Sequence, residues 1–248
     1  MSAVVLFVAL LGAWQAYTEI SGIDDFILPS PTQVATALFD DRALLWSNLV
    51  VTAEEMLLGI AVAAVVALAL AFAMHFGRPL RRAAFPLLIG SQTIPLPMIA
   101  ILLVTWLGLG LAPKVAIVAL ICFFPIVVTT LDGLAGVDPN LRKLMRTLDA
   151  SRWQTFWRIE LPTALPALMS GAKIAVAVSG IGAVLAEFSG SYDGLGHLVI
   201  QSLPQFETAR AWAAVVLLSA FAVALFTALS LAERWLLPWA HRSERTST

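Results

Sequence analysis

Long apolar runs separated by short polar stretches dominate this chain. Six runs are long enough to cross a bilayer, whose apolar core requires about 20 residues of α-helix. They span residues 3–20, 49–74, 83–107, 113–131, 164–187 and 211–232. Between the first two, Val34-Ala35 and Leu38-Phe39 recur at helical spacing and predict a short amphipathic helix at the membrane surface. The pattern predicts an all-α membrane protein with a single transmembrane domain over residues 1–248.

The polar segment at residues 138–162 is both basic and amphipathic. It carries five of the fifteen Lys and Arg residues of the chain. Apolar positions in its first half have helical spacing and are Leu141, Leu144, Met145 and Leu148. Asp149 predicts a turn, because Asp tolerates left-handed geometry, and it can cap the next helix. Pro162 is expected to stop that second helix. An apolar face outside the membrane has to dock on something, so we interpret the segment as a coupling element.

The run LMRTLDASRWQTFWRIELPTALP, which begins at Leu144, resembles the cytoplasmic coupling loop of binding-protein-dependent ABC transporter permeases. The pattern of that family is a Glu-Ala-Ala triplet, a Gly after three intervening residues and a closing Ile-x-Leu-Pro. This sequence has Lys143 where the family usually has Glu, and Asp149 where it has Gly. The resemblance implies the type I ABC importer permease fold, with six transmembrane helices and a coupling helix. It also implies that the ATPase-coupling residues are Lys143, Leu144, Met145, Arg146, Thr147, Leu148, Asp149, Ala150 and Ser151.

The same resemblance implies the partners of the chain. They are an ATP-binding cassette subunit that holds ATP and Mg, an extracytoplasmic substrate-binding protein, a second copy of this chain in a homodimer, and membrane lipid. No cofactor on this chain and no nucleic acid are implied. The runs CFFPIVVTTLDGL and SGIGAVLAEFSG look most like permeases for thiamine-precursor pyrimidines or riboflavin. Permeases for nitrate, sulfonates and taurine are the alternative.

Composition and charge agree with a cell-membrane location. The chain is 60% hydrophobic and 12% charged, whereas soluble domains carry about 25% charged residues. With alternating spans, eleven Lys and Arg residues fall on the side of the central loop and the C-terminal tail, and three on the other. The positive-inside rule therefore predicts that both termini and the central loop are cytoplasmic. Asp24, Asp25, Asp40 and Asp41 would then lie outside.

The third predicted span contains Pro95 and Pro97, which remove backbone hydrogen bonds and kink or break a helix. A break that lines a cavity and a kink absorbed by packing both remain open. Beside it, Gln92 and Thr93 are candidates for contact with a neutral solute, and interhelical hydrogen bonding is the alternative for each. The candidate pathway residues of the chain are Gln92, Thr93, Pro95, Ser179 and Glu187.

Small residues recur at intervals of four along the fifth predicted span. They are Gly171, Ala175, Ser179 and Ala183. Such a stripe permits close helix approach, either within one subunit or across a two-fold axis, where it would line the dimer interface or the pathway.

The spans also contain charged residues. Lys173 is expected to snorkel toward the cytoplasmic end of the fifth span, and Glu187 is either a solvated helix end or a pathway gate. Glu54 and Glu55 are expected at the N-terminus of the second span, where the helix dipole stabilises carboxylates.

Enzyme motifs are missing from the sequence. It has no GxxxxGK[ST] phosphate loop and no GxSxG elbow. His75, His197 and His241 are far apart in sequence, which disfavours a zinc site. We therefore expect a transport subunit without its own ATP site. A secondary transporter, which usually has two matching halves, and a non-transporting membrane scaffold are the alternatives.

Overall fold

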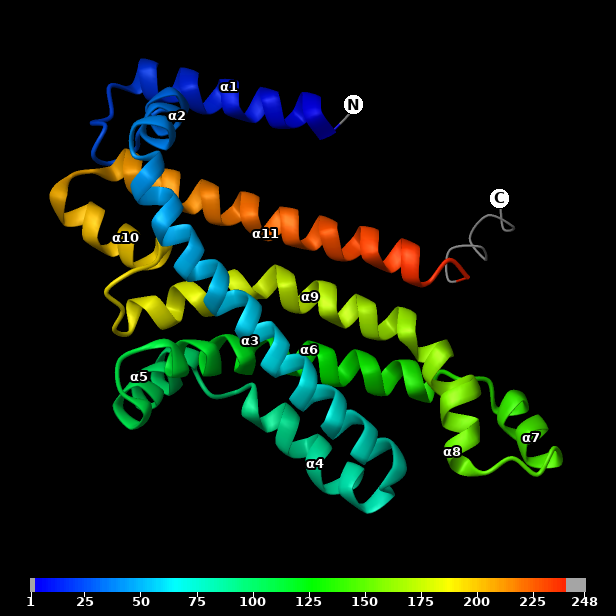
Figure 1. Ribbon diagram of the computed structural model, residues 1–248. Helices are drawn as coiled ribbons and strands as arrows, with labels where there is room; N and C mark the ends of the chain where they lie inside the picture. The colour runs from blue at the N-terminus through cyan, green and yellow to red at the C-terminus, as the bar shows by residue number, and fades with distance from the viewer. Residues whose placement is uncertain (1–2, 240–248) are drawn as a thin grey trace.

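The structure is a computed structural model that describes residues 3–239 (Figure 1). The sequence-based predictions for His241, Arg242 and Arg245 fall outside the described residues. Within this part of the chain there are helices and turns but no β-strand, which confirms the predicted all-α class.

Five helices are long and apolar enough to cross a membrane. They are α1 (Ala3–Ser21), α3 (Arg42–Phe76), α6 (Leu111–Ala135), α9 (Leu161–Phe188, in a continuous helical segment that begins at Arg152) and α11 (Thr208–Leu236). The helices α4 (Arg78–Ser91) and α5 (Leu96–Leu107) meet at 99° and together are long and apolar enough to count as one broken span. Six spans are therefore confirmed when this bent pair is counted as one. Pro95 is the N-cap of α5, so the prolines break the third span rather than kink it.

The remaining helical elements are short and lie at the ends of the bundle. They are α2 (Pro31–Asp40), α7 (Pro139–Thr147), α8 (Arg152–Thr155), a π-helical turn η1 (Phe156–Glu160), α10 (Leu195–Ser202) and a 3₁₀ turn η2 (Leu203–Gln205). The amphipathic helix predicted near Val34 is α2, with Val34 buried. α10 was not predicted from the apolar pattern.

The core lies between α3, α6 and α9, where small residues allow the backbones to approach closely. A Cβ added to Gly59 would clash with Val118, and one added to Gly171 would clash with Thr129. Ala175 and Ser179 are completely buried. The small-residue stripe of the fifth span therefore packs within one chain, against α6, and not across a two-fold axis.

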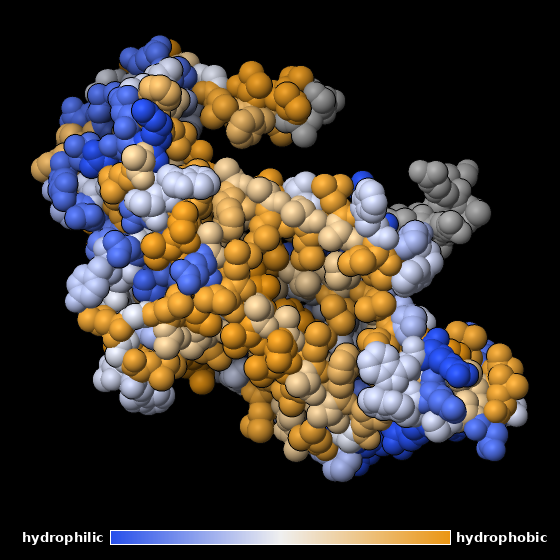
Figure 2. Space-filling model, in the orientation of Figure 1, coloured by the Kyte–Doolittle hydropathy of each residue, from blue (hydrophilic) through white to orange (hydrophobic). Residues whose placement is uncertain are grey.

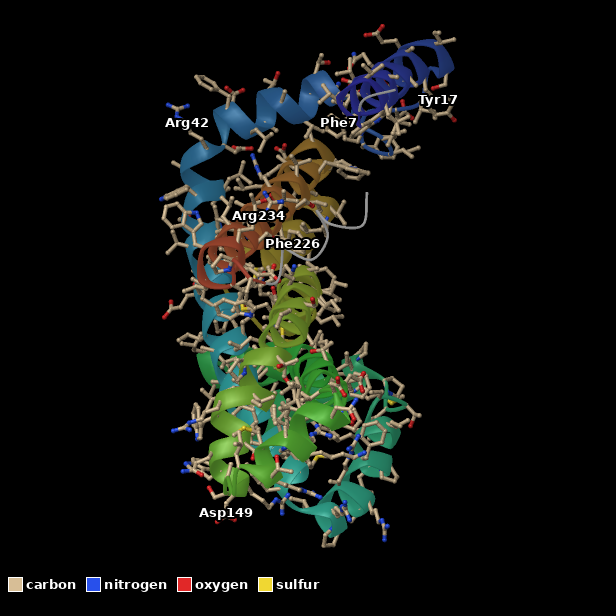
Figure 3. The ribbon with its side chains drawn as sticks, turned by 90° about the vertical axis from the view of Figure 1, so that its right-hand side faces the viewer. Phe7, Tyr17, Arg42, Asp149, Phe226 and Arg234 are labelled. Carbon is tan, nitrogen blue, oxygen red and sulfur yellow. The ribbon has the colours of Figure 1, made fainter. Side chains whose placement is uncertain are left out.

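α1 stands apart from this core and lies along one side of the molecule (Figure 1). Its main anchor is Trp14, whose ring centroid is 5.2 Å from that of Trp212 on α11. Most of its other apolar side chains are exposed, including Phe7 and Tyr17, and Figure 3 shows Tyr17 at the outer edge of the molecule.

The two ends of the bundle are polar and the middle is apolar. Figure 2 shows a hydrophobic belt between hydrophilic regions over α2 and over the α7–α8 end. Figure 3 looks onto the α7–α8 end and places Asp149 at its lower extremity. The chain thus has the belt expected of a multi-pass membrane protein.

The second and fifth spans are longer than predicted. α3 begins at Arg42, so Glu55 lies in its middle and not in its first turn. Pro162 does not end a helix, because α8, η1 and α9 are continuous. Pro162 has no backbone N–H to donate. Just before it the chain forms a π-helical turn, in which Leu161 N–H donates to Phe156 O, five residues back.

Candidate functional site

The loop at residues 138–162 is built from two capped helices and a tight turn. Asp138 accepts a hydrogen bond from Asn140 N–H at 2.8 Å and starts α7. Asp149 has a positive φ of 55°, as predicted for the turn. It does not cap α8, however, because Ser151 takes that role in a capping box with Gln154. The side chain one residue before the helix is the one that can reach its free N–H groups.

Glu160 fixes the loop to two other segments. Its Oε1 accepts from Arg142 Nε at 2.7 Å, and its Oε2 lies 2.7 Å from His75 Nε2 at the end of α3. Arg142 also donates to the Leu134 carbonyl at 2.6 Å. One carboxylate therefore joins α3, α7 and the start of the fifth span.

Aromatic side chains pack beneath the loop. Phe156 is 1% exposed, and its ring contacts those of Phe72, Phe76 and Trp153 with centroid distances of 5.0 to 5.8 Å. The loop is therefore held by apolar packing as well as by the Glu160 ion pairs.

The apolar face of α7 is only partly satisfied by this packing. Leu141, Leu144 and Leu148 are 38%, 52% and 68% exposed, whereas Met145 is 8% exposed. Met145 is therefore covered by its own chain and is not available to a partner, unlike the leucines. Of the other predicted coupling residues, Ala150 is half-buried and the rest are exposed: Lys143, Arg146, Thr147, Asp149 and Ser151.

A cavity of about 620 Å³ lies at the break between α4 and α5, against α6. Three of the predicted pathway residues line it: Gln92, Thr93 and Pro95. Ser91 and Thr93 use their hydroxyls to satisfy the Leu88 and Gly90 carbonyls at the end of α4. Among the described residues no charged side chain lines this cavity, so its polar surface there consists of hydroxyl, amide and backbone groups.

Ser179 and Glu187 lie elsewhere, in the interior of the chain. Ser179 is 0% exposed and donates to Val176 O at 2.8 Å, so it lies in the packed interior and lines none of the cavities described here. Glu187 is 1% exposed, so it is neither a solvated helix end nor an exposed gate.

Glu187 instead holds the N-terminus of α10. One oxygen accepts from Thr52 at 2.6 Å, and the other accepts from the N–H groups of Gly196 and His197. Asn48 and Thr52 accept from the N–H groups of Gly194 and Leu195. The four backbone N–H groups of residues 194–197, at the start of α10, therefore all donate to buried side chains. A helix end inside a protein requires such acceptors.

Two further charges predicted to act alone are paired. Glu55 is 0% exposed and accepts from Lys114 at 2.6 Å, which joins α3 to α6. Lys173 does not snorkel but donates to Glu233 on α11 at 2.7 Å. A buried charge needs such a partner, because desolvation would otherwise be too costly.

Four residues of these networks were not predicted from the sequence: Glu160, His75, Asn48 and Thr52. Glu160 carried one weak signal, because it is the only glutamate in the 138–162 segment. Asn48 and Thr52 are four residues apart and share a helix face, but nothing in the sequence shows what that face meets.

Comparison with known proteins places these features in context. Residues 57–242 match the family described as binding-protein-dependent transport system inner membrane component. The chain is 33% identical over 236 residues to the formylaminopyrimidine transport permease protein ThiX of Halalkalibacterium halodurans, covering 95% of this chain and 94% of that protein. It is 35% identical over 237 residues to the riboflavin transport system permease protein RibX of Chloroflexus aurantiacus, covering 95% and 88%.

A more distant relative and a solved structure extend the comparison. The taurine transport system permease protein TauC of Escherichia coli is 29% identical over 241 residues, covering 93% of this chain and 86% of that protein. The crystal structure of an amino acid ABC transporter with histidines matches with a TM-score of 0.64 at 15% identity, covering 82% of this chain and 97% of that one. At this identity the structural match concerns the fold alone.

Proposed function

This chain belongs to the binding-protein-dependent transport system inner membrane components, the permeases of ABC importers, and from that membership we propose its detailed role. It forms a homodimer that moves a small solute into the cytoplasm. ATP and Mg bind to two copies of a separate ATP-binding subunit, and a substrate-binding protein delivers the solute from outside.

The observation that carries the proposal is the exposed apolar face of a braced loop. Leu144 and Leu148 are more than half exposed, yet Glu160 and Phe156 hold the backbone beneath them in place. Burying a leucine side chain contributes about 1.5–3 kcal/mol, so a groove on the ATP-binding subunit would gain substantially from covering both. A braced loop can also transmit movement of that subunit to α3 and α9.

The orientation proposed from the charge distribution places this loop in the cytoplasm. In the structure the 138–162 loop and the start of α4 lie at one end of the bundle, and α2 and α10 lie at the other (Figure 1). Cysteine labels at Asp40 and Gln205 should therefore react with an impermeant reagent from outside, and a label at Arg152 should not. The reverse pattern would overturn the orientation.

For the substrate, we infer a neutral heteroaromatic compound such as a thiamine-precursor pyrimidine or a flavin. The cavity at the α4–α5 break offers Gln92 and Thr93 but no charged side chain. A sulfonate entering it would lose hydration without gaining a cation, whereas a neutral amide or ring can exchange hydrogen bonds with these groups. The relatives ThiX and RibX support this class, and TauC keeps taurine-like solutes as the competitor.

The coupling proposal is tested with a double variant in the complex reconstituted with its ATP-binding partner. Leu144→Ala with Leu148→Ala should lower solute-stimulated ATP hydrolysis at least about tenfold, since two half-exposed leucines lose their contact. Leu203→Ala is the matched control, because Leu203 is 50% exposed but belongs to η2 near the outer end. Hydrolysis and copurification that survive the double change would refute the docking role. Uptake of labelled pyrimidine, flavin and taurine by the wild-type complex then separates the substrate classes.

A further inference from the structure

A second cavity, of about 330 Å³, lies at the end of the bundle that carries α7 and α8. Its walls come from the ends of α3 and α6, the start of α4, and the 138–162 loop. Five arginines line it: Arg78, Arg81, Arg142, Arg146 and Arg152. The volume equals that of about ten water molecules, so it can hold a hydrated ionic group.

The positive charge of this cavity is largely uncompensated. Glu160 is the one acid among its lining residues, and its two oxygens are already engaged by Arg142 and His75. Arg78, Arg81, Arg146 and Arg152 make no ion pair with any residue of the part of the chain that the structure describes. Like charges that converge on one hollow repel one another, and an anion would relieve that repulsion.

The start of α4 adds to the same positive potential. α4 has 14 residues, and its N-cap, Gly77, has no side chain to accept from the free N–H groups of the first turn. A helix N-terminus favours anions through these groups and through its dipole. Four unpaired guanidinium groups and this helix end therefore face one region.

An apolar hollow continues from the arginine pocket along α4. It measures about 300 Å³ and shares Arg78 and Arg81 with the pocket, and its other lining residues are Arg82, Phe85 and Pro86. Trp153 and Trp157 near the pocket are 59% and 50% exposed, as is common for tryptophans at the headgroup level of a membrane. The site thus joins a cationic pocket to an apolar groove, which fits an amphiphile better than a free ion.

We propose that this arginine pocket binds a phosphate-bearing anion, and that its source is the headgroup of an anionic phospholipid whose acyl chain follows α4. The guanidinium groups of Arg78, Arg81, Arg146 and Arg152 would contact the phosphate oxygens, since their planar donors match phosphate. Basic pockets beside transmembrane helices bind such headgroups. The bound lipid would bridge α4 and the 138–162 loop, two segments that no ion pair in the described residues joins directly.

The test is lipid retention by the purified full-length chain, measured by native mass spectrometry in a neutral detergent. Phosphatidylglycerol is titrated against phosphatidylcholine with the same acyl chains. Arg81→Gln with Arg146→Gln should weaken phosphatidylglycerol binding about 25-fold, or about fivefold for each arginine near the surface. Arg158→Gln is the matched control, because Arg158 is an exposed arginine of the same loop that does not line the pocket.

Further arms separate the sources of phosphate and guard against misfolding. Arg81→Lys with Arg146→Lys keeps the charge but loses the planar donors, so it should bind the lipid more tightly than the Gln variant and less tightly than the wild type. Displacement of the lipid by inorganic phosphate at an equal concentration would assign the pocket to a free anion and overturn the lipid source. Equal binding of the two lipids by the wild type, or equal retention in the Gln and wild-type chains, would overturn the site itself.

Discussion

Removing Glu160 should release the 138–162 loop from the rest of the chain. Its carboxylate makes two charge-assisted contacts of 2.7 Å, to Arg142 and His75. Hydrogen bonds to charged groups contribute about 1.5–3 kcal/mol each. Arg142 has a side chain that is 31% exposed, so water competes for it and the lower value is appropriate. Two such contacts give about 3 kcal/mol, which corresponds to a factor of roughly 100 in an equilibrium.

The assay is amide hydrogen exchange within residues 139–160, which reports local opening. Glu160→Ala should lower protection of these amides about 100-fold, while the amides in the middle of α6 stay protected. Arg158→Ala is the control, since Arg158 is exposed in the same turn and has no ion pair in the described part of the chain. The doubly changed chain, Arg142→Ala with Glu160→Ala, should lose less than the sum of the single losses, because the two residues share one contact. Protection that stays within threefold of wild type, or additive losses in the double variant, would refute the role of Glu160.

Two other predictions concern the interior and the turn. Lys114→Met alone should destabilise the chain by about 3–5 kcal/mol, because Glu55, which is 0% exposed, would lose the one cation that pairs with it among residues 3–239. Adding Glu55→Leu should restore most of this stability. Denaturation in detergent measures both, and a single variant no less stable than the double would contradict the pairing. Asp149→Gly should be more stable than Asp149→Ala by about 1 kcal/mol, because φ at this residue is 55° and a left-handed backbone disfavours a Cβ. Equal exchange protection of the loop in these two variants would show that the turn imposes no such constraint.

The sequence by itself determined the spans and the basic, amphipathic 138–162 loop between two of them. A run of apolar residues long enough for the bilayer is a local property, so the six predicted spans correspond to α1, α3, the α4–α5 pair, α6, α9 and α11. The break at Pro95 and the turn at Asp149 were also readable, because each depends on the backbone chemistry of one or two residues.

Helix ends were less readable. α3 begins seven residues before the predicted span, since it continues beyond the apolar run into the polar residues from Arg42 onward. Pro162 fails to stop a helix, because the π-helical turn Phe156–Glu160 precedes it and places it in the first turn of α9. Such adjustments depend on the neighbouring turns, which local composition does not specify.

Only the tertiary structure decided which polar groups meet. Glu55 and Lys114 are separated by 59 residues in the sequence, Lys173 and Glu233 by 60, and Thr52 and Glu187 by 135. From the sequence, Lys173 was expected to snorkel, Glu187 to be a solvated helix end or a gate, and Glu55 to be stabilised by the helix dipole, whereas each of these side chains is bonded to a distant residue. The same holds for the five arginines that converge on one cavity from separate segments. The rotation of each helix about its axis determines these encounters, and that rotation is set by close packing between α3, α6 and α9, not by the hydropathy of any one of them.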